Sequence, residues 1–300
     1  MTAPRDPTAA TDLALRALCW PPAPGQPHLP DWPLRDRHAG LGELIETAIL
    51  HKVLCLLAHR LATTGLDRHL PRAISRFLSG TLRANQYKTR IYRAEIARIV
   101  VAFVEAGLTT AALNGIAVES SLYGGTGARQ FTDLDVLLAP GHSTHARAVL
   151  TGLGYHSSAP EATAFTRHIE DILVPRITLD LTQTMHHATD EHGVREVLSR
   201  RRWQPLPGHH QPLPVLGAPD ALLHCLARLA RTTRTPPQAG APRWALCADA
   251  LRLAHAYENL PVAHRNPVLL VPATATAGWE RLRHIWPQLA ATPFPAGKKP

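Results

Sequence analysis

Cysteine is scarce in this sequence of 300 residues: there are four, and no two of them form a C-x-x-C pair. The four are Cys19, Cys55, Cys225 and Cys247. Each falls within an apolar helical pattern, so we expect buried, reduced thiols and neither a disulfide framework nor a zinc site. The eighteen histidines form no H-E-x-x-H motif. We interpret His186-His187 and His209-His210 as solvated loop residues.

Long apolar runs are also missing. No run approaches the ~20 residues that a membrane helix needs, and residues 1–18 lack the basic segment, apolar core and cleavage site of a signal peptide. We therefore expect a cytoplasmic protein with no membrane partner. The hydrophobic content of 45% is enough for a real core, and the length suits one large or two modest domains.

Lysine is rare too: only four of the 32 basic residues are lysines, although the net charge is +9. A positive charge raises the question of a nucleic-acid partner. The one compact basic run, Arg200-Arg201-Arg202, is interpreted as a solvated helix end. No basic residues interleave with aromatic ones in the way that is typical of single-strand binding. A nucleic-acid partner is left open but is not favoured.

The sequence does contain a candidate catalytic stretch, Leu113 to Leu138, in which a short predicted strand carries two aspartates. Side chains alternate along a strand, so Asp133 and Asp135 share one face while aliphatic residues occupy the other. Their carboxylates can therefore converge on one hard divalent cation such as Mg²⁺. An isolated Asp-x-Asp is also common on solvated strands, and the metal interpretation needs a third carboxylate.

A third carboxylate is found in the strand pattern Ile177 to Gln183. Asp180 falls on the polar face of this strand with Thr178 and Thr182, opposite three aliphatic residues. Aspartate is unfavourable in a strand interior, so this one calls for a functional reason.

The order of these features resembles a known family. An apolar strand, a glycine at the turn, a helix ending in Tyr and then R-x-x-x-D-x-D is similar to the uncharacterised bacterial nucleotidyltransferase family of the DNA polymerase beta-like nucleotidyltransferase superfamily. The matching residues are Leu113, Gly115, Tyr123, Arg129, Asp133 and Asp135. Two positions depart from the family pattern: Asn114 stands where Lys is common, and Thr182 stands where His is common.

The resemblance implies the site residues. The implied catalytic and metal-binding residues are Asp133, Asp135 and Asp180, with Mg²⁺ or Mn²⁺ as cofactor. The implied nucleotide-binding residues are Asn114, Gly115, Arg129 and Asp249. Arg129 would neutralise phosphate charge or brace the aspartates, and Asp249 would face the pocket or pair with Arg252. Gly115 has two interpretations. It either lets a phosphate approach the N-terminus of the following helix, or it is a plain turn glycine.

The predicted fold class is α+β: a small mixed β-sheet nucleotidyltransferase core with helices on one face, flanked by N-terminal and C-terminal helical regions. The predicted regions are 1–107 (helical), 108–189 (α/β core), 190–290 (helical) and 291–300 (disordered tail). The predicted strands are 108–113, 133–138, 162–170 and 176–183. The predicted helices outside the core are 11–19, 41–66, 71–107 with one or two breaks, 194–202, 219–231 and 242–257.

Three functions follow from this interpretation. The leading hypothesis is transfer of a nucleoside monophosphate from an NTP, ATP by preference, to a hydroxyl of a small molecule or peptide. Because Asn114 and Thr182 depart from the family, the second is a catalytically impaired nucleotide-binding protein on the same fold. The third is a toxin-like transferase acting on tRNA, which the positive charge encourages.

Overall fold

The structure is a computed structural model that describes residues 7–21, 40–159, 161–232, 243–260, 273–287 and 289. The predicted disordered tail, 291–300, lies outside these residues. Helices lead into the sheet: α1 (Pro7–Cys19), α2 (Leu41–Leu50), α3 (Leu54–Thr64), the 3-10 helix η2 (Leu66–His69) and α4 (Arg72–Glu105).

The helix predicted over 41–66 is two helices, α2 and α3. The chain turns at Lys52, whose φ is 57°. The Lys52 and Val53 N–H groups donate to the carbonyl oxygens of Ile49 and Ala48, at 3.1 and 2.8 Å. A left-handed residue ends a helix in this way, and a helical pattern of apolar residues does not reveal it.

Helix α4 runs without a break through its 34 residues, where we predicted one or two breaks. It contains no proline, which is the residue that most often breaks a helix. Its predicted apolar stripe is buried against the sheet at Ile96, Val100 and Phe103, whereas Val104 is 49% exposed. Burial of each such side chain stabilises the fold by roughly 1.5–3 kcal/mol.

The strands of the described residues form one mixed sheet of seven strands, in the order β3-β4-β5-β2-β1-β7-β6. Their bounds are β1 (Thr110–Leu113), β2 (Leu134–Leu138), β3 (His156–Ser157), β4 (Ala164–His168), β5 (Arg176–Thr182), β6 (Arg202–Gln204) and β7 (Leu213–Val215). The central strand β2 pairs antiparallel with β1 and parallel with β5. The four predicted strands are present, and β3, β6 and β7 are additional.

Strands β6 and β7 lie beyond residue 189, in the region predicted to be helical. The helix predicted over 194–202 is α7 (Glu191–Ser199), and β6 begins at Arg202. β7 joins the sheet by pairing with β1, where Ala112 faces Val215. Strands of three residues are too short to show an alternating pattern. The division of the chain at residues 107 and 189 stays a prediction, and the sheet crosses the second boundary.

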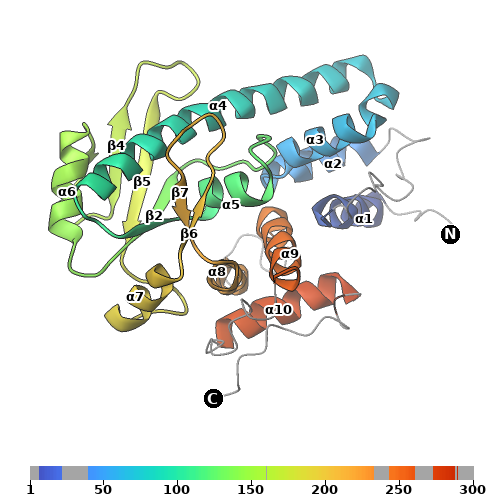
Figure 1. Cartoon of the computed structure of the whole chain (residues 1–300). Helices are drawn as coiled ribbons and strands as arrows, with labels where there is room; N and C mark the ends of the chain where they lie inside the picture. Colours follow the sequence, from blue (N-terminus) through green and yellow to red (C-terminus); the bar gives the residue numbers. More distant parts are fainter. Residues whose placement is uncertain are drawn as a thin grey trace.

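Helices lie on both faces of the sheet, which corrects the prediction of one face. Helices α4 and α6 (Ser143–Gly152) pack on one face, and α7 packs on the other (Figure 1). A further helical layer joins α1, α2 and α3 to α8 (Ala218–Thr232), α9 (Trp244–Glu258) and α10 (Ala273–Ile285). Helix α5 (Asn114–Leu122) contacts both the sheet and this layer. The α+β fold class is confirmed.

The four cysteines are free and buried, as predicted. None of the helices in the described ranges combines the length and the apolar character needed to cross a membrane.

The histidine pair 186–187 is only partly solvated, contrary to our interpretation. The side chain of His187 is buried and its Nε2 lies 3.3 Å from Asp220 on α8, while His186 is half-buried and stacks on His224. Asp220 is itself buried and needs partners, which is the reason for its contact with His187.

The basic run 200–202 does not form one solvated helix end either. Arg200 pairs with the buried Asp220 at 2.9 Å, and Arg201 lies over the ring of Trp203, 5.9 Å from its centroid. Arg202 belongs to β6. The three residues therefore lie in different surroundings.

Candidate active site

Asp135 and Asp180 lie directly beside each other, on the neighbouring parallel strands β2 and β5. Residues in register on adjacent strands carry their side chains to the same face, with the strands ~4.8 Å apart. Asp133 immediately precedes β2, lines the same cavity as Asp135, and acts through its charge on both Asp135 and Asp180. Leu137, on the same face, packs in the cluster with α7, so the aspartates lie on the face opposite to α4. The fold thus brings a distant third carboxylate next to the Asp-x-Asp pair.

The charge of Asp133 acts on the pKa values of the two other aspartates. Burial raises the pKa of Asp135 to about 6; a hydrogen bond from Asn114 opposes this, and the charges of Asp133 and Asp180 add to it. Burial and the charge of Asp133 also raise the pKa of Asp180. A cation between carboxylates relieves such repulsion, and Mg²⁺ and Mn²⁺ prefer oxygen ligands.

The donor set therefore fits a hard divalent ion in its chemistry, but the side chains do not gather around one point. Within the described parts of the chain, no three His, Cys, Asp or Glu side chains stand as a ready metal site.

Asn114 links the aspartates to helix α5. Its Nδ2 donates to Asp135 Oδ2 at 2.8 Å. The residue has φ 50°, which is rare for a residue other than glycine, and begins α5 directly after β1. No side chain caps the N-terminus of α5, so the N–H groups of its first turn are available to an anion.

Close packing explains why position 115 is a glycine, and the sequence does not reveal this reason. A Cβ added at Gly115 would lie 2.4 Å from Cβ and 2.8 Å from Cγ of Phe131. Phe131 is buried and meets Tyr92 edge to face, at 5.3 Å between ring centroids. The glycine therefore allows the loop before β2 to lie against α5, whether or not a phosphate also approaches its backbone.

A cavity of about 340 Å³ opens beside these residues. One part of its wall is acidic and contains Asp133 and Asp135. Another part is basic and contains Lys52, Arg228 and Arg243, from the α2–α3 turn, from α8 and from the residue before α9. We did not predict these three cations, because each is an isolated basic residue without a local motif. Only the fold brings them to one cavity.

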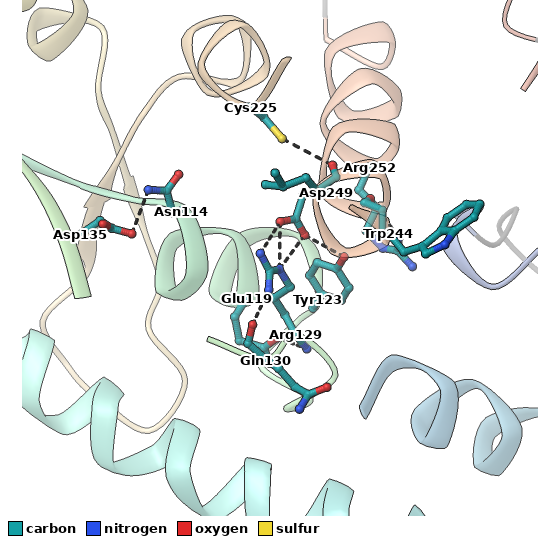
Figure 2. A network of polar contacts seen from close by, with 12 residues as sticks. Asn114, Glu119, Tyr123, Arg129, Gln130, Asp135, Cys225, Trp244, Asp249 and Arg252 are labelled. Atoms are coloured by element: carbon teal, nitrogen blue, oxygen red, sulfur yellow. Dashed lines mark hydrogen bonds and ion pairs between the residues drawn. The ribbon is translucent and has the colours of Figure 1, made fainter. Parts of the chain in front are cut away.

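Arg129 contacts neither Asp133 nor Asp135, the partners that we considered for a structural arginine. Its Nε lies 2.9 Å from both carboxylate oxygens of Asp249, and its Nη2 lies 2.8 Å from one of them. Figure 2 shows this pair apart from the bond between Asn114 and Asp135. Both side chains of the pair are almost fully buried.

Asp249 does not pair with Arg252 on the surface. It also accepts a hydrogen bond of 2.9 Å from the hydroxyl of Tyr123, which lies after the end of α5. Arg252 instead lies over the Tyr123 ring, 4.5 Å from its centroid, and donates to backbone carbonyl oxygens. The carboxylate of Asp249 is thus satisfied by protein groups, and it joins α9 to the core.

Glu119, on α5, was not predicted as part of the site. Its two carboxylate oxygens accept hydrogen bonds from the N–H groups of Gly127 and Arg129, at 2.6 and 2.9 Å. Burial raises the pKa of Glu119 to about 7, although these bonds and the nearby Arg93 oppose the rise. Glu119 thus anchors the loop that leads to Asp133.

Comparison with known proteins identifies the family of the chain that carries this site. The family model described as "Uncharacterised nucleotidyltransferase" matches residues 38–246, which include the three aspartates. Among solved structures, the chain is similar to an antigenic nucleotidyltransferase-like protein from Paracoccidioides brasiliensis, with a TM-score of 0.45 and 12% identity, over 66% of this chain and 90% of that chain. No curated protein matches. Because the family model covers more than half of the chain, the protein is a transferase that belongs to the family of uncharacterised nucleotidyltransferases.

Proposed function

We propose that the protein moves a nucleoside monophosphate from an NTP, ATP in the first instance, to a hydroxyl of a small molecule or peptide, with Mg²⁺ or Mn²⁺. One observation carries the proposal: Asp180 lies in register with Asp135, and Asp135 lines, with Asp133, a cavity that basic residues also line. A cavity with carboxylates on one side and cations on another suits a metal-bound triphosphate.

The three aspartates have separate tasks in this proposal. Asp133 and Asp135, on one strand, hold the ions and the triphosphate. Asp180, on the next strand, contributes to ion binding and takes the proton of the acceptor hydroxyl. The hydroxyl oxygen bonds to the α-phosphorus of the NTP as the bond to the β-phosphate breaks and pyrophosphate leaves. Divalent ions, when bound, neutralise phosphate charge and stabilise the attacking and leaving oxygens of an in-line displacement.

The cations and the start of α5 bind the phosphates. Lys52, Arg228 and Arg243 line the cavity, and the free N–H groups of α5 favour an anion. These side chains supply the positive charge that position 114 lacks, so the departure at Asn114 is compatible with activity. Asn114 itself holds Asp135 in place through its hydrogen bond.

Arg129 and Asp249 support the site indirectly in this proposal. Hydrogen bonds from Arg129 already engage both carboxylate oxygens of Asp249, and Tyr123 engages one of them, which ties this side chain to the protein itself. Two residues of the run 200–202 are also engaged within the protein: Arg200 pairs with Asp220, and Arg201 lies over Trp203. This favours a small-molecule or peptide acceptor over a polynucleotide.

The test is incubation of the protein with each labelled NTP, Mg²⁺ or Mn²⁺ and a lysate of its native host, followed by mass spectrometry. We expect a product whose mass has increased by one nucleoside monophosphate. Asp180→Asn should abolish this product while retaining NTP binding, since Asp180 serves the acceptor. Labelled tRNA instead of a small product would favour the toxin-like function, and binding without any product would favour the impaired protein.

A further inference from the structure

A second cavity, of about 240 Å³, lies between α5, α8, α9 and strands β1 and β7. Aliphatic side chains dominate its wall. They include Leu113, Val118, Leu122, Val215, Leu216 and Leu253. Such a lining suits the faces of an apolar or aromatic group.

The two cavities adjoin. Asn114, Arg228 and Leu246 line both of them. The first cavity is charged and the second is mainly aliphatic. A ligand that fills both must therefore have a polyanionic end and an apolar end, joined close to Arg228.

Several polar residues also line the second cavity, and among them His224 lacks hydrogen-bond partners within the described part of the chain; the others are Asn114, Ser121, Arg202, Gln204, Arg228 and Asp249. The ring nitrogens of His224 have no solvent exposure. His186 stacks on it, with 5.4 Å between ring centroids. Burial and the charge of Arg228 lower the pKa of His224 well below its usual value, so the ring is neutral. A neutral imidazole offers one donor and one acceptor, and buried polar groups without partners are costly.

We propose that the second cavity binds the nucleoside of the NTP, with the base packed among the aliphatic side chains and its polar edge toward His224. This inference rests on the proposed function, and it specifies where the substrate lies. A nucleoside triphosphate has the required character, a polyanion joined to a planar base. The acceptor then approaches from the side of Asp180, because β5 lies on the opposite side of β2 from β1 and β7.

The test compares two ligands, MgATP and magnesium tripolyphosphate, which lacks the nucleoside. Ala221 lines the second cavity and does not line the first. Ala221→Leu should fill the second cavity and weaken MgATP binding by about tenfold or more, while tripolyphosphate binding changes less than about threefold. His224→Leu should act in the same direction. Ala84→Leu, at an exposed position on α4, is the matched control.

The outcomes separate the two proposals. Unchanged MgATP affinity in Ala221→Leu and His224→Leu, with transfer lost, would assign the cavity to the acceptor and overturn this inference. An equal loss for both ligands would also overturn it. Wild-type protein that binds neither ligand would instead refute the proposed function. Thermal unfolding of each variant shows whether it is folded at the assay temperature.

A different observation carries a second inference, which concerns Lys52. Lys52 occupies the left-handed position after α2, with the two backbone bonds of a Schellman ending. Glycine is the usual residue there, because other side chains strain the backbone. A lysine at this position therefore needs a role that compensates for the backbone strain. Lys52 lines the first cavity, whose wall also contains Asp133 and Asp135.

We infer that Lys52 is retained against backbone strain because its ammonium group binds the triphosphate; this too rests on the proposed function. Asp133 and Lys52 both act on the neighbouring Lys88, whose pKa is lowered by burial and by Lys52 and raised by Asp133. The charges of Lys52 and Asp133 therefore act on the same neighbouring group, Lys88.

The test is Lys52→Gly. Its urea unfolding midpoint should stay the same or rise, because glycine adopts this φ without strain. Its affinities for MgATP and for tripolyphosphate should both fall by about tenfold or more, the loss expected for a charged contact. Lys52→Arg should restore both affinities. Unchanged affinity in Lys52→Gly, or a fall in the unfolding midpoint that accompanies the weaker binding, would overturn the inference.

Discussion

Arg129 and Asp249 form a two-pronged ion pair: the guanidinium Nε and Nη2 lie 2.8–2.9 Å from the carboxylate oxygens. Arg129 lies in the loop before β2, and Asp249 lies on α9. The pair therefore fixes the loop of the catalytic strand to the helical layer behind it. Removal of one partner would leave a buried charge without compensation.

We expect Asp249→Asn to lower the free energy of unfolding by about 3–5 kcal/mol, the usual cost of breaking a buried pair. Its affinity for MgATP, measured where it is folded, should change less than about threefold. Urea unfolding and a binding titration check this. Asp12→Asn, which breaks the exposed pair of Asp12 and Arg16, should cost about 1 kcal/mol or less. If Asp249→Asn instead loses much of its MgATP affinity at unchanged stability, Asp249 binds the nucleotide directly.

Asp135→Asn should separate catalysis from folding. Neighbours of metal ligands are worth about 10–100-fold in activity, so loss of a ligand should reduce transfer by at least about 100-fold. Stability without metal should stay the same or rise, because the variant removes a carboxylate whose ionisation burial and Asp133 disfavour. Transfer assays and thermal unfolding measure the two effects. Glu46→Gln, an exposed carboxylate change on α2, is the control, and unaltered transfer in Asp135→Asn would contradict the mechanism.

Gly115→Ala should destabilise the protein by about 1–3 kcal/mol, the usual cost of overpacking. The reason is the distance of 2.4 Å between the new Cβ and Phe131 Cβ. Gly80→Ala, where a new Cβ meets nothing within 4 Å inside α4, should instead stabilise by about 0.5–1 kcal/mol. Urea unfolding of both variants checks the contrast. Equal effects would show that packing against Phe131 is not the reason for the glycine.

Glu119 and Glu95 should give pH dependences of opposite sign. Burial raises the pKa of Glu119 to about 7, so the folded state binds an extra proton and stability from this group falls as pH rises from about 4.5 to 7. For Glu95, burial raises the pKa. Hydrogen bonds from Arg98 and Tyr155 lower the pKa of Glu95, and the net shift is downward. Its stabilisation is present above the ordinary pKa of glutamate and is lost as pH falls below it.

The measurement is urea unfolding of wild type, Glu119→Gln and Glu95→Gln between pH 3.5 and 8. Stability of wild type relative to Glu119→Gln should decline with rising pH, by at most about 1.4 kcal/mol per pH unit. Relative to Glu95→Gln it should increase with pH in the acidic range. Slopes of the same sign for both variants would contradict these environments.

Several features were predictable from the sequence because they depend on local periodicity. Alternation along a strand places Asp133 and Asp135 on one face, and the same rule places Asp180 opposite its aliphatic neighbours. A period of 3.6 residues predicted the buried stripe of α4. Only the β2–β5 register shows that these faces are the same face of the sheet and that Asp180 lies beside Asp135.

Other features depended on contacts between distant segments. The partner of Arg129 is Asp249, the basic wall comes from Lys52, Arg228 and Arg243, and β7 pairs with β1 through one residue pair. None of these has a local signal, because a single charged residue or a strand of three residues has no period. The sequence by itself determined which residues could carry the chemistry; the packing of helices against the sheet decided which of them meet, because side-chain partners are chosen by burial and charge across the whole fold.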